Sequence, residues 1–202
     1  MASDPDTYTH HPLLFDPKDK TLSLSHASPS LSKHLNELNT LSKSLSSLPI
    51  PIPPPPLPVS PHRSAAIDKL RTSGNNEFRK QQYSSAINYY TMAIQAAQTR
   101  PVWEPAGLMR DEMQVLYANR AQAYLGMGCW PEAYADADMA VDMKKIQNPK
   151  AWWRKGKALM EMGRVDEARE VLKDGLEFGE DQELRALLKE VEGKIDGRKG
   201  KV

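Results

Sequence analysis

Residues 74–93, GNNEFRKQQYSSAINYYTMA, recur in altered form as AQAYLGMGCWPEAYADADMA at 121–140 and as GKALMEMGRVDEAREVLKDG at 156–175. Each copy carries small residues at three matching places: Gly74, Ala121 and Gly156, then Ala86, Ala133 and Ala168, then Ala93, Ala140 and Gly175. In all three sets, the residue of the second copy lies 47 positions after that of the first, and the residue of the third copy lies 35 positions after that of the second. Small residues at fixed places let paired helices approach closely. The pattern therefore predicts stacked helix pairs with a concave binding groove.

The chain is predicted to be an all-α solenoid of three helical hairpins closed by a C-terminal capping helix. The repeats are expected at about 67–100, 114–147 and 149–180 and the capping helix at about 181–195, within a domain spanning 62–202. Residues 99–112 form an insertion after the first repeat, where Pro101 and Pro105 are expected to exclude a regular helix. Asn148 and Pro149 predict the start of the third repeat, with Asn as the N-cap residue.

Residues 1–48 are predicted to form a small docking segment. The stretch LLFDPKDKTLSLS at 13–25 is compatible with a short hairpin. Leucines recur at spacings of three, four and seven and predict an amphipathic helix over residues 30–48. These leucines are Leu31, Leu35, Leu38, Leu41, Leu45 and Leu48. The helix either packs on its own repeat domain or docks a separate protein. For docking, the candidates are Leu31, Leu35, Leu38 and Leu45, with Trp103 in the insertion.

Residues 49–61, PIPIPPPPLPVSP, hold 8 of the chain's 16 prolines. Proline fixes φ and lacks the backbone N–H donor, so this segment is expected to be an extended polyproline II linker. A ligand for an SH3 or WW domain is the alternative, and a semi-rigid spacer is the preferred interpretation.

Composition excludes several function classes. The net charge of +1 gives no general attraction to nucleic acid. Cys129 is the only cysteine, so no internal disulfide forms. No secretory signal and no apolar run long enough for a membrane span are visible. The five histidines lie in the N-terminal part without a metal-ligand pattern, and no phosphate-binding loop is present. We therefore expect no enzyme, no metal and no cofactor.

The groove is expected to carry five polar residues from the first helices of the three repeats. Arg71 and Asn75 are four positions apart, as are Lys150 and Arg154, so each pair shares a helix face. Asn119 lies on the first helix of the second repeat. Three cations and two amides suit the capture of carboxylates, such as those of an extended chain end finishing in Asp or Glu. Any one of the five alone is explained by a solvated face, whereas the set favours binding.

These residues also carry a resemblance. The repeats resemble tetratricopeptide repeats (TPR), and RTSGN at 71–75, YANRAQAY at 117–124 and KAWWR at 150–154 resemble the two-carboxylate clamp of chaperone-binding members. That resemblance implies a grip on the terminal Glu-Glu-Val-Asp of heat-shock chaperones. Arg71 stands where the clamp usually has lysine, which keeps the charge and changes the shape. Trp153 is a candidate groove wall, and repeat packing explains it equally well.

The whole chain resembles the cytosolic TPR subunit of the fungal post-translational protein-translocation complex of the endoplasmic reticulum (ER). The likeness includes the N-terminal segment, the proline-rich joint, AAQTRPVWEP at 96–105 and LRALL at 184–188. It implies a non-catalytic adaptor on the cytosolic face of the ER membrane, held there by a membrane-anchored partner subunit. Its expected clients are chaperones of the heat-shock-seventy class, which the clamp alone does not separate from the ninety class. The alternatives are a soluble co-chaperone and a plain TPR scaffold.

Overall fold

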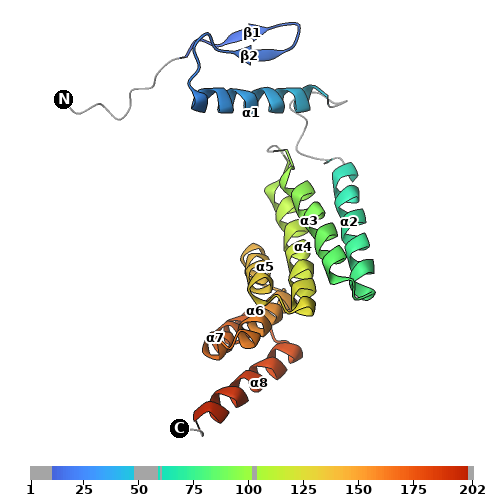
Figure 1. Ribbon diagram of the computed structural model, residues 1–202, viewed down its shortest axis with the longest axis vertical. Coiled ribbons are helices and arrows are strands. Elements are labelled where there is room, and N and C mark those ends of the chain that lie inside the picture. The colour runs from blue at the N-terminus through green and yellow to red at the C-terminus, as the bar shows by residue number, and fades with distance from the viewer. Residues whose placement is uncertain (1–10, 48–58, 60, 102–103, 200–202) are drawn as a thin grey trace, which may run out of the picture. The chain divides into compact units, whose positions relative to one another are not determined.

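The computed structural model describes residues 11–47, 59, 61–101 and 104–199 (Figure 1). The chain divides into two compact units, Met1–Leu57 and Pro58–Val202, which are described separately below. Among the described residues, no helix combines the length and the apolar character that crossing a membrane requires.

The first unit contains a short antiparallel hairpin. Strand β1 (Leu14–Asp16) pairs with strand β2 (Thr21–Ser23), and Phe15 lies opposite Leu22. The Asp16 carboxylate accepts the backbone N–H two residues further on (2.8 Å), which closes the turn. The hairpin expected within residues 13–25 is therefore present.

Helix α1 (Pro29–Ser46) completes this unit and packs on β2. The Ser28 side chain caps it by accepting the N–H of Leu31 (3.3 Å). The Asn39 amide accepts the backbone N–H of Leu22 and donates to its carbonyl (2.8 Å each), as a neighbouring strand would. The predicted helix is confirmed, and its immediate partner is the hairpin.

The leucine stripe of α1 is unevenly buried. Leu31, Leu35, Leu41 and Leu45 are half-buried, and Leu48 lies outside the described residues. Leu38 keeps 49% of its surface exposed, and in the hairpin Phe15 keeps 61%. An apolar surface thus remains on the N-terminal unit after α1 has packed on the hairpin.

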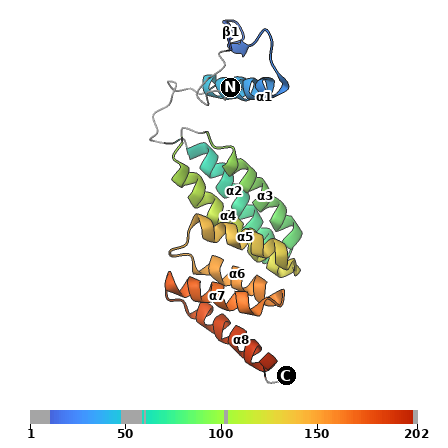
Figure 2. The same cartoon turned by 90° about the vertical axis from the view of Figure 1, so that its left-hand side faces the viewer.

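The second unit is a stack of helix pairs (Figure 2). Its helices are α2 (Pro61–Arg79), α3 (Tyr83–Gln98), α4 (Ala106–Met127), α5 (Trp130–Met143), α6 (Pro149–Glu161), α7 (Val165–Glu177) and α8 (Gln182–Lys199). Each helix packs on the next, and α2, α4, α6 and α8 also touch in sequence as an inner row. The predicted all-α solenoid is confirmed, and its inner row forms the groove.

The small residues of the repeats lie where helices meet, and all nine are buried. A Cβ atom on Gly156 would lie 2.5 Å from Cδ2 of Leu172 on the paired helix, and one on Gly74 would lie 2.6 Å from Cε1 of Tyr90. Such distances are far below van der Waals contact, so glycine sets the close approach of these pairs.

The start of the second repeat differs from the expectation. Helix α4 begins at Ala106 and not near Asp111, so the non-helical insertion is shorter than residues 99–112. Pro105 occupies the N-cap position, where a proline does not prevent the residues after it from continuing as helix. Ala106, Leu108, Met109 and Arg110 are good helix formers, and with Gly107 among them they extend the helix by more than a turn.

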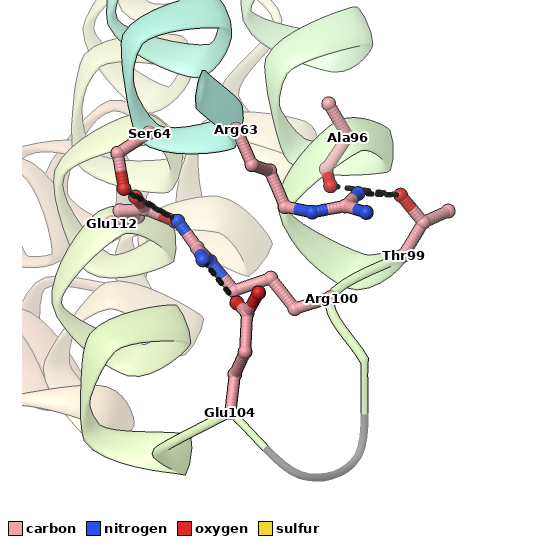
Figure 3. Close-up of polar contacts among 7 residues, drawn as sticks. All are labelled: Arg63, Ser64, Ala96, Thr99, Arg100, Glu104 and Glu112. Carbon is pink, nitrogen blue, oxygen red and sulfur yellow. Dashed lines mark hydrogen bonds and ion pairs between the residues drawn. The ribbon is translucent and has the colours of Figure 1, made fainter. Parts of the chain in front are cut away.

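Arg100 holds this insertion against both neighbouring helices (Figure 3). Its side chain is only 2% exposed. It donates to the Ser64 hydroxyl at the start of α2 (2.7 Å), to Glu112 of α4 (Nε to Oε2, 2.8 Å) and to Glu104. Burial acts to lower the pKa of Arg100, but the hydrogen bonds that it donates to Glu112 and Glu104, together with their charges, outweigh burial and raise the pKa. Trp103, from the same loop, lies outside the described residues.

Helix ends in the third repeat also differ in detail. Asn148 stands at the N-cap position of α6, yet its amide donates to the carbonyls of Ala140 (3.1 Å) and Lys144 (2.9 Å) at the end of α5. It therefore caps the preceding helix rather than its own. Asp181 caps α8 by accepting the N–H of Leu184 (3.0 Å), and α8 continues to Lys199, beyond the expected end near residue 195.

Replacing Gly156 by Ala tests the close approach. We expect Gly156→Ala to lower the free energy of unfolding by about 1–2 kcal/mol, because Leu172 is fully buried and has no room to move. The control is Gly193→Ala in α8, where a Cβ meets nothing within 4 Å and helix propensity adds up to about 1 kcal/mol. Urea unfolding measures both. Equal shifts in the same direction would contradict this account of the packing.

Candidate functional site

All five predicted groove residues lie on helices of the inner row. Arg71 and Asn75 come from α2, Asn119 from α4, and Lys150 and Arg154 from α6. The structure joins the two asparagines directly, since Asn119 Nδ2 donates to Asn75 Oδ1 (3.3 Å). The charges of Arg154 and Arg71 both act on the pKa of Tyr90, a buried tyrosine of α3.

Tyr90 of α3 orients Asn75. Its hydroxyl donates to Asn75 Oδ1 (2.7 Å), the same oxygen that accepts from Asn119. With its oxygen occupied by two donors, Asn75 presents its amide N–H groups, which have no partner among the described residues. Burial raises the pKa of Tyr90, while the nearby Arg154, Arg71 and Arg79 act to lower it. The tyrosine remains a neutral donor, and the two hydrogen bonds fix the orientation of the Asn75 amide.

Arg154 is a largely buried cation with a neutral partner. Its Nε donates to Oε1 of Gln122 on α4 (2.9 Å), and it forms no ion pair with any described carboxylate. Burial lowers the pKa of Arg154 to about 10, and the electrostatic influence of Tyr90 and Glu183 only partly offsets this. The four other N–H groups of the guanidinium lack protein partners among the described residues and reach solvent. Hydrogen-bond donors of this kind are chemically suited to an anion.

Arg71 differs from Arg154 because it already has a counter-ion. Asp68, one turn earlier on α2, accepts from its Nε (3.0 Å) and from its NH2 group. Arg71 also lines a separate cavity of about 660 Å³ with Ile67 and Leu116. The positive charge of the groove is therefore concentrated at α6.

The positively charged residues of α6 line a cavity of about 600 Å³ between α6 and α8. Lys150, Trp153 and Arg154 come from α6, and Gln122 from α4. Glu183 and Leu187 come from α8. Trp153 is half-buried, so it both lines this cavity and packs against the repeat core.

Sequence patterns missed four residues of the site. Asp68 is three positions before Arg71, a spacing that does indicate an ion pair on a helix. Tyr90, Gln122 and Glu183 contact the site from other helices, and no local spacing reveals those pairings.

The sequence matches known proteins along most of its length. The family profile described as tetratricopeptide repeat matches residues 149–178. The ER protein translocation subcomplex subunit sec67 of Schizosaccharomyces pombe is 39% identical over 150 residues, which are 71% of this chain and 77% of that protein. The chain belongs to the sec67 family.

Solved structures agree with this membership. A chain in the cryo-EM structure of the Sec complex from S. cerevisiae is 26% identical to the present chain, with a TM-score of 0.66 over 93% of this chain and 99% of that one. The second TPR domain of human RPAP3, in complex with the HSP70 peptide SGPTIEEVD, is 25% identical with a TM-score of 0.52, covering 66% of this chain and 98% of that domain.

Arg154→Met tests the uncompensated charge. Because burial of the cation costs stability at every pH below about 10, where Arg154 is protonated in the folded state, we expect the variant to raise the free energy of unfolding by about 1–3 kcal/mol at pH 7. Thermal and urea unfolding measure the change. The control is Arg169→Met, on the half-exposed face of α7, for which we expect a change within about 0.5 kcal/mol. A destabilised Arg154→Met protein would show that this residue serves the fold.

Proposed function

We propose that this chain is a non-catalytic adaptor of the ER protein translocon. Its groove binds the C-terminal Glu-Glu-Val-Asp tail of heat-shock-seventy chaperones and so recruits precursor proteins for post-translational translocation. The observation that carries the proposal is Arg154, a buried guanidinium held by the neutral Gln122 with its remaining donors free. Membership of the sec67 family and the likeness to a TPR domain that binds an HSP70 peptide support it.

The polar groups of the site are arranged as donors. Asn75 turns its oxygen toward Tyr90 and Asn119, and Gln122 turns its oxygen toward Arg154, so amide N–H groups remain for a ligand. A terminal Asp offers two adjacent carboxylates to such donors. Charge-assisted hydrogen bonds contribute about 1.5–3 kcal/mol each. After the cost of ordering the tail, we expect an affinity on the order of micromolar.

In this proposal the five groove residues contribute unequally to the binding of the tail. Arg71 keeps Asp68 as its counter-ion and therefore offers less net charge to a ligand. Lys150 is exposed at the first turn of α6 and supplies a compact charge beside Arg154. In this proposal α6 supplies most of the attraction, while Asn75 and Asn119 fix the position of the terminal carboxylate.

The proposal places the chain at the cytosolic face of the ER membrane through a membrane-anchored partner subunit. The docking surface would be the apolar part of the N-terminal unit, where Phe15 and Leu38 stay exposed and Leu31, Leu35 and Leu45 are half-buried. Large exposed apolar patches are typical of protein interfaces. Trp103 remains a docking candidate outside the described residues.

The tail proposal is tested by fluorescence polarisation with a labelled peptide ending in Glu-Glu-Val-Asp and with the same peptide amidated. We expect micromolar binding that weakens with salt and is lost on amidation. Gln122→Glu should weaken binding at least tenfold, since the new carboxylate would pair with Arg154. Gln95→Glu makes the same change at an exposed position of α3, outside the inner row, and the affinity of this variant for the peptide should stay within twofold of wild type.

Two results would contradict the tail proposal. Equal binding of the free and amidated peptides would remove the carboxylate clamp. Absence of binding by folded wild-type protein would leave a TPR scaffold whose groove serves another ligand.

The docking surface has its own test. Leu38→Glu should weaken binding of the membrane-anchored partner subunit at least tenfold in a surface-plasmon-resonance titration, because it places a charge in the apolar patch. Asn36→Glu, on an exposed position of the same helix, is the matched control. The tail peptide should bind both variants as it binds wild type. Unchanged partner binding by Leu38→Glu and by a chain lacking residues 1–48 would disprove docking through this unit.

A further inference from the structure

The two ends of the groove differ in charge. At α6, the cations Lys150, Arg154 and Lys157 outnumber the carboxylates in the lining of the cavity beside α8. At the other end, the cavity beside Arg71 is mainly apolar, and its carboxylates are Asp68, which pairs with Arg71, Glu112, which pairs with Arg100, and Asp111. An acidic peptide segment is therefore favoured at the first end over the second. If the proposed tail binding holds, the residues that precede the terminal Asp therefore lie over the cavity between α6 and α8.

One carboxylate of this cavity has no ion-pair partner among the described residues, although its charge acts on Arg154. Lys157 pairs with Glu161 (2.8 Å), and Glu190 pairs with Lys194 (3.4 Å). Glu183, in the first turn of α8, is exposed and forms no ion pair with any described residue. It faces the same cavity as Arg154. The cavity thus has a cationic wall on α6 and an anionic group on α8.

The remaining lining is apolar. Trp153 from α6 and Ala186 and Leu187 from α8 line the cavity together with the charged groups. A neutral aliphatic side chain can pack on these residues without meeting an unpaired charge. A carboxylate in the same place would approach Glu183 and desolvate against Trp153.

We propose that Glu183 is a specificity-determining residue that limits how many acidic residues the groove accepts. The site binds the acidic end of a tail at Lys150 and Arg154. It then selects an uncharged side chain at the peptide position immediately before the Glu-Glu-Val-Asp segment, because Glu183 repels a further carboxylate at that position. The inference rests on the proposed tail binding and adds its selectivity.

The physical need for such a residue is discrimination. A groove with three cations attracts any acidic chain end, including long runs of Glu or Asp. Specific recognition requires an element that is unfavourable for the wrong ligand as well as contacts to the right one. Glu183 supplies that unfavourable element from a helix that carries none of the five clamp residues.

The test compares two labelled peptides, SGPTIEEVD and the same peptide with its Ile replaced by Glu. We expect wild type to prefer the Ile peptide about tenfold. Glu183→Gln should reduce this preference below threefold, chiefly by strengthening binding of the Glu peptide. Glu192→Gln, the same change of charge on α8 at a position outside the cavity lining, should keep the wild-type preference.

Each outcome decides between the ideas. If Glu183→Gln keeps the tenfold preference, or strengthens both peptides equally, Glu183 is not a selectivity residue. If wild type binds neither peptide in a carboxylate-dependent way, the proposed tail binding itself fails and this inference falls with it. Circular dichroism should show all three proteins equally helical.

Discussion

The contact between the Tyr90 ring and the backbone of Gly74 connects the packing of the first repeat to its chemistry. A side chain at position 74 would overlap the ring, so only glycine lets α3 carry Tyr90 so close to α2. The ring then crosses α2 and its hydroxyl reaches Asn75, the next residue along the chain. The same small residue that defines the repeat therefore also fixes the orientation of a groove amide. Packing and recognition depend on one interhelical distance.

At α6, the stability of the fold and the proposed binding place opposite demands on Arg154. An apolar residue in place of Arg154 would raise the free energy of unfolding, since the charge of Arg154 is largely buried and its partner Gln122 is neutral. Retaining such a cation makes sense where an anion from outside completes the pairing. Arg100 shows the contrary arrangement in the same domain, with Glu104 and Glu112 as permanent partners. Arg100 therefore has a structural role, whereas Arg154 has a proposed recognition role.

Repetition made the helices predictable, whereas contacts between them were not. The nine small residues that mark the repeats are all buried on paired helices, as their recurrence in three copies predicts. The expectation that Pro105 excludes helix as far as residue 112 is wrong, because a proline at the N-cap position does not prevent the residues after it from forming a helix. Asn148 has the residue type and position of an N-cap, but the nearer carbonyls of α5 bind its amide. The five groove residues were found from helical spacing, and their roles remain predictions. Gln122 and Glu183 come from separate helices, and one sequence carries no sign of that proximity.

Helix α8 has a consequence for motion. In the part of the chain that the structure describes, it packs on α6 and α7 alone, whereas the helices inside the stack have neighbours on both sides. In a linear array, the terminal element opens at lower free energy than the interior. Opening of α8 would remove Glu183 and one wall of the cavity, while Asn75, Asn119 and Arg154 stay in place. Under the proposed function, the protein would then still bind a chain end but would discriminate less among chain ends, so fidelity would fail before affinity as temperature rises.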